Sequence, residues 1–208
     1  MARAQIISGT DAGELLVAGS GNDFLYGHGG NDELQGSGGD DQLQGGAGDD
    51  QLYGGAGRDR LYGQEGADFY DGGDGADQLF AGGIVGGGDT LKGGQGADLF
   101  AWVGRFTGVD TVLDFQRGSD KIDLSRIDAD ERTTPGNITG KNTPGNEAFT
   151  ISSAPDGVTP GLLVFSSGVD DLNRPITIIS GYTDTIDGVD FEIHLLGAYN
   201  LTSADFIL

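Results

Sequence analysis

Large apolar side chains recur at a fixed spacing of nine residues through the first half of the chain. Residues 81–83 interrupt the count once, after which it resumes. The series comprises Leu25, Leu34, Leu43, Leu52, Leu61, Tyr70, Leu79, Leu91 and Phe100. Because successive side chains of a strand point to opposite faces, one apolar residue in each copy predicts a short strand with a single inward side chain. Such a strand cannot bury its side chain alone, so the repeat predicts a solenoid of stacked copies.

Aspartate and glycine keep the same nine-residue phase. An aspartate stands two residues before each apolar residue, at Asp23, Asp32, Asp41, Asp50, Asp59, Asp68, Asp77, Asp89 and Asp98. A glycine stands two residues before each aspartate, at Gly21, Gly30, Gly39, Gly48, Gly57, Gly66, Gly75, Gly87 and Gly96. The pattern Gly-Gly-x-Gly-x-Asp-x-Leu-x predicts a six-residue turn and a three-residue strand per copy. Two copies per coil give two parallel sheets about 10 Å apart.

Aspartates two repeats apart are expected to lie in neighbouring coils, roughly 4.8 Å from each other. Ionised carboxylates at that separation repel, so we expect a hard cation between coils, bound by carboxylates and by carbonyl groups of the turns. Calcium suits this site because it takes six to eight oxygen ligands in flexible geometry. The expected cofactor is Ca²⁺, at about seven ions per chain. The stacked pairs are 23/41, 41/59, 59/77, 77/98, 32/50, 50/68 and 68/89.

The repeat resembles that of the RTX (hemolysin-type calcium-binding repeat) family over residues 9–101. The resemblance implies an all-β fold, a right-handed parallel β-roll over residues 1–101, in which the repeat aspartates bind calcium. His28, Ser37 and Gln64 depart from glycine at the second position of the pattern, where a carbonyl ligand survives if the backbone angles do. The resemblance also implies turn carbonyl ligands, among them those of Gly21, Gly30, Gly39, Gly48, Gly57, Gly66 and Gly75.

The repeat stops after Trp102, and residues 102–208 are expected to form a β-rich, β-sandwich-like cap on the open end of the roll. Alternating or apolar runs predict strands near 109–115, 120–125, 162–166, 176–180 and 191–196, whereas residues 128–160 are rich in turn formers and predict a loop.

The C-terminal half resembles the C-terminal domain of serralysin-type metalloproteases and related type I secreted proteins. The segments 110–115, 120–125, 190–195 and 201–208 carry this resemblance. It implies an uncleaved secretion signal in which Asp205 precedes the apolar residues 206–208. An ordinary edge strand explains the same residues, and both readings stand together. The repeats are also similar to the repeat modules of mannuronan C5-epimerases.

The amino-acid composition limits the classes of binding partner that we expect. Acidic residues outnumber basic ones by 33 to 11, so the net charge is −22. A surface this negative repels nucleic acid and anionic lipid, and we expect neither as a partner. No apolar run approaches the roughly 18 residues of a membrane span. The chain has no cysteine for disulfide or thiol chemistry.

No motif predicts catalysis. A zinc protease helix of the His-Glu-x-x-His kind is missing, since His28 and His194 are the only histidines. The sequence contains neither a nucleophile elbow nor a Walker loop. We therefore expect no enzyme activity in this chain. Asp184, Asp187, Asp190 and Glu192 are candidates for a further ion.

Two functions remain open at this stage. The first is a secreted, extracellular module of a bacterial exoprotein that folds on external calcium and supports type I secretion and stability. Its partners are calcium, the type I exporter and a fused or upstream enzyme domain. The alternative is an accessory module that binds an anionic, alginate-like polysaccharide for an extracellular enzyme such as a mannuronan C5-epimerase. A free-standing adhesion protein is a third and weaker reading.

Overall fold

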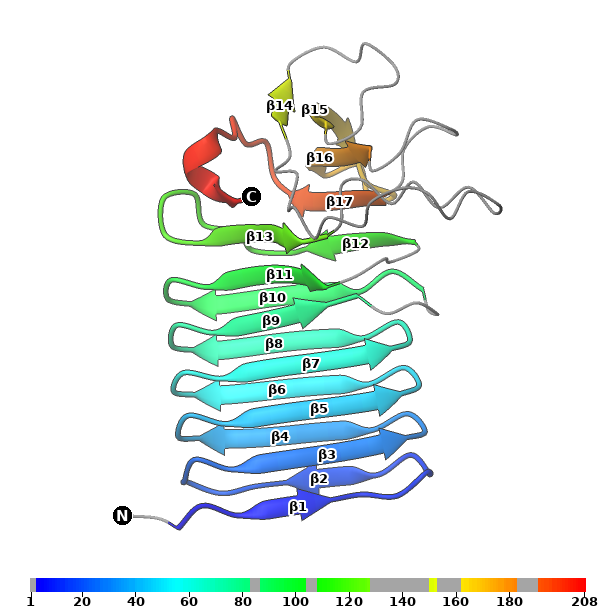
Figure 1. The fold of residues 1–208 in the computed structure, drawn as a ribbon, viewed down its shortest axis with the longest axis vertical. Helices are drawn as coiled ribbons and strands as arrows, with labels where there is room; N and C mark the ends of the chain where they lie inside the picture. Colours follow the sequence, from blue (N-terminus) through cyan, green and yellow to red (C-terminus); the bar gives the residue numbers. More distant parts are fainter. Residues whose placement is uncertain (1–2, 83–86, 104–107, 128–149, 153–161, 183–190) are drawn as a thin grey trace, which may run out of the picture.

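Two long sheets wind together as a solenoid in the computed structural model of the chain (Figure 1). The structure describes residues 3–82, 87–103, 108–127, 150–152, 162–182 and 191–208. All regular elements within these residues are strands, except for one short 3-10 turn, η1 (Ser203–Asp205). The roll strands are β1 (Ile6–Ser8), β2 (Leu15–Val17), β3 (Phe24–Gly29), β4 (Glu33–Gly38), β5 (Gln42–Ala47), β6 (Gln51–Ala56), β7 (Arg60–Glu65), β8 (Phe69–Asp74), β9 (Gln78–Ala81), β10 (Thr90–Gln95) and β11 (Leu99–Val103).

Odd-numbered roll strands form one sheet and even-numbered ones the other. Each strand pairs in parallel with the strand two copies further along, as in Phe24 with Gln42 and Leu34 with Leu52. This register is the predicted spacing of two repeats per coil. The apolar eighth position is fully buried from Leu25 to Phe100, so the leucines meet between the sheets. The prediction of a parallel β-roll is confirmed.

The strands are longer than predicted. Most span six residues rather than three, because ladder pairing continues into the turn, as in His28 with Gly46 and Gly29 with Ala47. The second turn position takes a positive φ even where it is not glycine: 79° at His28, 76° at Ser37 and 81° at Gln64. The backbone angles that the pattern requires therefore survive all three substitutions.

The parallel ladders continue beyond residue 101. β12 (Val109–Val112) pairs with β10, and β13 (Lys121–Arg126) pairs with β11, both in parallel. They complete a further coil of the roll without a break in either sheet. The boundary predicted between a roll of residues 1–101 and a cap of residues 102–208 thus falls inside β11. The division into two domains stays a prediction.

The remaining strands extend the same two sheets instead of forming separate ones. β17 (Phe191–Leu196) pairs in parallel with β12, and antiparallel neighbours follow it in the order β17, β16 (Pro175–Tyr182), β15 (Leu162–Val169). β14 (Thr150–Ser152) adds a parallel edge, and β18 (Phe206–Ile207) pairs with β13 on the other sheet. The sandwich-like cap is therefore the upper end of the two roll sheets (Figure 1).

The predicted C-terminal strands near 109, 120, 162, 176 and 191 are all present. The loop prediction for 128–160 is wrong at 150–152, which form β14, and residues 128–149 and 153–160 lie outside the described residues. Asp184, Asp187 and Asp190, three of the four residues considered for a further ion, also lie outside them.

Candidate calcium-binding rows

All nine repeat aspartates are buried, with exposed fractions between 0 and 4%. They stand in two rows, one along each edge of the roll. In each row, the backbone N–H of one aspartate donates to Oδ1 of the aspartate in the next coil. The distances are 2.7 Å from Asp23 to Asp41 and 2.8 Å from Asp32 to Asp50. The predicted stacking is thus realised through hydrogen bonds that orient every carboxylate toward the preceding coil.

Both rows are longer than the repeat pattern indicates. Asp89 N–H donates to Asp110 Oδ1 at 2.7 Å, and Asp98 N–H donates to Asp120 Oδ1 at 3.1 Å. The complete rows are Asp23, Asp41, Asp59, Asp77, Asp98 and Asp120 on one edge, and Asp32, Asp50, Asp68, Asp89 and Asp110 on the other. The spacing widens to 21 and 22 residues in the last coils, so a search for a fixed period misses Asp110 and Asp120.

The second carboxylate oxygen divides the rows into two groups. It has a donor in four aspartates: Gly19 N at 3.4 Å for Asp23, Gly82 N at 3.2 Å for Asp89, Trp102 Nε1 at 2.6 Å for Asp110 and Gln116 N at 2.7 Å for Asp120. In the other seven, Oδ2 is buried and accepts no hydrogen bond from the described residues. These are Asp32, Asp41, Asp50, Asp59, Asp68, Asp77 and Asp98.

Burial raises the pKa of six of these carboxyls, and nearby acids raise it further; the six are Asp41, Asp50, Asp59, Asp68, Asp77 and Asp98. The pKa of Asp41 and of Asp50 rises from 3.8 to about 6, that of Asp59 to about 7 and that of Asp68 to about 8. The hydrogen bond from the preceding coil lowers each value without offsetting the desolvation. Without a counter-charge, the fold therefore opposes ionisation of these acids.

A glycine five residues before the aspartate leaves room for each unpartnered Oδ2. A Cβ at Gly36 would lie 2.5 Å from Asp41 Oδ2, and one at Gly54 would lie 2.5 Å from Asp59 Oδ2. The same holds at the other five, and the seven glycines are Gly27, Gly36, Gly45, Gly54, Gly63, Gly72 and Gly93. Sequence reasoning missed the part that this first turn position plays, although its glycines are the signal that separates the seven aspartates from the others.

The glycines two residues before the aspartates direct their carbonyl groups along the rows. A Cβ at Gly39 would collide with the carbonyl oxygen of Gly21, and one at Gly57 would collide with that of Gly39. Gly48, Gly66 and Gly75 repeat this arrangement against Gly30, Gly48 and Gly57. Six of the seven predicted carbonyl groups, all but that of Gly66, thus face the neighbouring coil, and their role as ligands stays a prediction.

The donor set of the turns consists of oxygen. No three His, Cys, Asp or Glu side chains gather in the described part of the chain, so the other ligands of a cation here would be carbonyl groups and water. A buried carboxylate oxygen without a donor requires a proton or a cation. Hard oxygen ligands in flexible turns fit Ca²⁺ better than the strict octahedron of Mg²⁺. The residues present therefore fit calcium.

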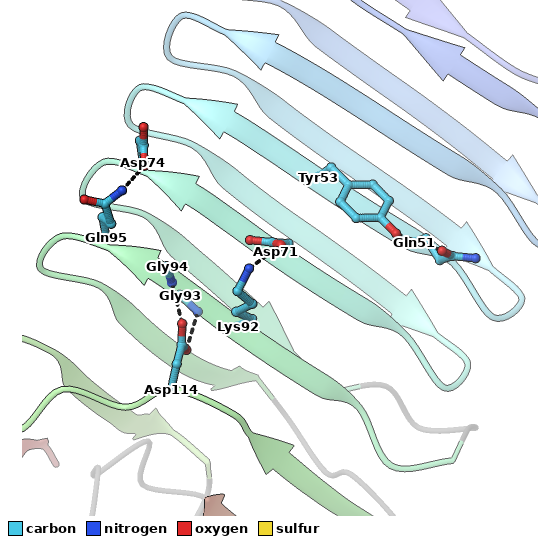
Figure 2. A network of polar contacts seen from close by, with 9 residues as sticks. All are labelled: Gln51, Tyr53, Asp71, Asp74, Lys92, Gly93, Gly94, Gln95 and Asp114. Atoms are coloured by element: carbon cyan, nitrogen blue, oxygen red, sulfur yellow. Dashed lines mark hydrogen bonds and ion pairs between the residues drawn. The ribbon is translucent and has the colours of Figure 1, made fainter.

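Ordinary side-chain contacts join the coils on the outer faces. Lys92 Nζ donates to Asp71 Oδ2 at 2.8 Å, and Gln95 Nε2 donates to Asp74 Oδ1 at 2.7 Å, each acceptor lying in the preceding coil (Figure 2). Asp114 accepts the N–H groups of Gly93 and Gly94, both at 2.9 Å. Both its oxygens are thereby used, so Asp114 is a turn-fixing residue and has no oxygen like those of the seven.

The fold and its buried acidic rows define a calcium-binding solenoid. Residues 8–43, 44–79 and 85–101 match the family model of the RTX calcium-binding nonapeptide repeat. This part of the chain consists of RTX calcium-binding repeats, and the predicted resemblance is confirmed. The repeat region is a calcium-binding module and not a catalytic domain by itself.

Three solved structures are similar to the chain. The AlgE6R3 subunit from the Azotobacter vinelandii mannuronan C5-epimerase is 22% identical, with a TM-score of 0.45 over 96% of this chain and 80% of that one. The AlgE6R2 subunit from the same enzyme is 25% identical, with a TM-score of 0.31 over 70% and 90%. The extracellular lipase LipA from Serratia marcescens is 18% identical, with a TM-score of 0.32 over 100% and 40%. No functionally curated protein matches the chain significantly.

A search of the described residues for a helix with the length and apolarity of a membrane span finds none.

Proposed function

We propose that this chain is a calcium-triggered folding module of a bacterial exoprotein that leaves the cell through a type I exporter. The observation that carries the proposal is the set of seven buried Oδ2 atoms without a donor. Ionised at neutral pH and without a cation, these carboxylates destabilise the closed roll. The chain then stays unfolded where free calcium is scarce and folds where calcium is abundant, because binding energy becomes folding energy.

The ligands that we propose are the carboxylates of the repeat aspartates and the carbonyl groups of the glycines two residues before them. Seven ions would add fourteen positive charges to the net −22, at one ion for each unpartnered Oδ2. This set of seven sites differs from the stacked pairs expected from the sequence in one place. It omits the site between Asp68 and Asp89 and adds a site at Asp32, on the side of the preceding coil. Asp89 Oδ2 has a donor in Gly82, and Asp32 Oδ2 has none.

An unfolded chain can thread an exporter channel that a folded roll cannot. The proposed export signal is the end of the chain, where Asp205 is buried and closes a capping box on Thr202. Its side chain lies 3.5 Å from Arg117. β18 also pairs with β13, so the same residues serve as an edge strand after folding.

Far-ultraviolet circular dichroism during a calcium titration tests the folding step. In calcium-free buffer at pH 7.5 we expect a largely unfolded spectrum, and the strand signal should develop cooperatively with calcium around the ~10⁻⁴–10⁻³ M affinities of extracellular modules. Magnesium at equal concentration is the control and should not replace calcium. A complete strand signal in chelator would contradict the proposal.

Polysaccharide binding is a second candidate, favoured by one surface feature. A groove of about 270 Å³ on the even-numbered sheet is lined by Glu33, Gln35, Ser37, Tyr53 and Gly55. The Tyr53 ring lies 5.8 Å from that of Phe69, and its hydroxyl donates to Gln51 (Figure 2). Aromatic faces beside amide and hydroxyl groups suit a sugar ring.

Titration with alginate oligomers in saturating calcium tests this candidate. Binding should weaken in Tyr53→Ala and remain in Tyr26→Ala, because Tyr26 belongs to the opposite sheet. If no amide resonance of the wild-type protein shifts, polysaccharide binding is discarded.

A further inference from the structure

The first turn position on the odd-numbered sheet changes character toward the C-terminal end of the roll. It is Gly27, Gly45 and Gly63 in the lower coils, each with an unpartnered Oδ2 beside it. The strand register then places Ala81 and Trp102 at the same position, since Trp102 pairs with Ala81 in β11 and β9. The row of open positions therefore meets a large side chain at its last coil.

The Trp102 side chain is fully buried, and it reaches the last carboxylate of the row. Its Nε1–H donates to Asp110 Oδ2 at 2.6 Å, and Asp110 is 1% exposed. Asp110 Oδ1 accepts the N–H of Asp89 at 2.7 Å, as every earlier aspartate of the row does from its own predecessor. Asp110 Oδ1 is thus bonded as Asp50 Oδ1 is, but an indole N–H bonds Asp110 Oδ2, whereas Asp50 Oδ2 is unpartnered. In Asp89, one coil before Asp110, Oδ2 accepts the backbone N–H of Gly82 at 3.2 Å.

We infer that Trp102 keeps calcium out of the last turn of this edge by placing its indole N–H where a cation would otherwise bind Asp110. Asp110 then satisfies both oxygens with donors of the chain itself and holds no calcium. An indole N–H offers a partial positive charge to a carboxylate without a bound ion, so Asp110 itself needs no calcium to offset its charge. The inference rests on the proposed calcium rows, and it excludes the last turn of this edge from them.

The pair Asp110 and Asp50 provides a matched test. Calcium per folded chain is counted by native mass spectrometry for the wild type, Asp110→Asn and Asp50→Asn. We expect Asp110→Asn to keep the wild-type number and Asp50→Asn to lose at least one ion. Loss of an ion in Asp110→Asn would overturn the inference. An unchanged number of calcium ions in Asp50→Asn would instead contradict the proposed calcium rows. The contact between Trp102 and Asp110 would then be tested by the second measurement alone.

The second measurement needs no substitution. Trp102 is the only tryptophan, so the calcium-loaded protein has a single indole Nε1–H resonance in its NMR spectrum. We expect this proton to exchange with solvent over hours or longer, because the bond to Asp110 is buried. Exchange within minutes in the calcium-loaded protein would overturn the inference, even if Asp110→Asn does not fold.

Discussion

The roll and the C-terminal strands β14–β18 belong to the same two sheets, yet they handle charge in opposite ways. The roll buries a carboxylate in every turn and leaves seven of their oxygens without a donor. The described C-terminal strands pack Leu163, Ile179 and Ile193 into the same core. Their acids find partners within the chain, as Asp170 does with Arg174 at 2.6 Å. The difference teaches that the roll encloses carboxylates that need a proton or a cation, whereas the C-terminal strands rely on ordinary packing.

The largest expected effect is a pH response of the calcium-free roll. Asp41, Asp59 and Asp68 have pKa values raised from 3.8 to about 6, about 7 and about 8. Their contribution to stability is therefore full below 3.8 and is lost as pH rises from there through the raised values. Calcium-free chain that is unfolded at pH 8 should therefore gain strand structure at pH 5. The affinity for calcium should fall over the same interval, because protons and calcium compete.

Circular dichroism in resin-treated buffer at both pH values measures this response. Asp170 is the internal contrast, since Arg174 and neighbouring backbone N–H groups lower its pKa and it takes no part in the transition. A calcium-free chain with the same strand content at pH 5 and pH 8 would show that the buried acids do not control folding.

The next effect in size compares two glycines. A Cβ at Gly75 would overlap the carbonyl oxygen of Gly57 in the coil below, whereas one at Gly118, between β12 and β13, meets nothing within 4 Å. Both have positive φ, 154° and 89°. Gly75→Ala should lower the unfolding free energy in saturating calcium by on the order of 3 kcal/mol, because the coils must separate.

Gly118→Ala should cost only about 1 to 2 kcal/mol, the price of the left-handed conformation. Urea denaturation of both variants at the same calcium concentration provides the comparison. Equal destabilisation would mean that close contact between coils does not explain the turn glycines.

The smallest effects separate two aspartates. Asp59→Asn removes a carboxylate from the middle of one row and should lower the bound calcium and the midpoint of thermal unfolding in calcium. Asp170→Asn removes an exposed ion pair and should change neither measurably. Calorimetry with and without calcium makes the comparison sharper, because Asp59→Asn should raise the residual structure of the calcium-free chain. If Asp59→Asn instead lowers thermal stability both with and without calcium, Asp59 has a packing role.

The outer faces of the two sheets show which side-chain positions the sequence predicted and which it did not. Its alternation separates inward from outward positions along every roll strand, but exposure of the outward ones varies with their neighbours. Phe24 is 41% exposed at the first coils, whereas Phe80 is 8% exposed because Tyr62 stacks on it at 4.4 Å and Arg126 lies over its ring. Arg126 reaches this place only through the pairing of β13 with β11, which no local pattern predicts.

The nine-residue repeat by itself determined the roll, its register, its leucine core and the stacking of nine aspartates. It could do so because every coil has the same turn, the same strand and the same inward side chain, so identical coils pack on one another in the same register. Tertiary structure alone decided that Asp110 and Asp120 join the rows, that Trp102 meets Asp110 and that the C-terminal strands continue both sheets. These contacts join residues at irregular spacing, and their geometry depends on which strands pair, a choice made by long-range packing.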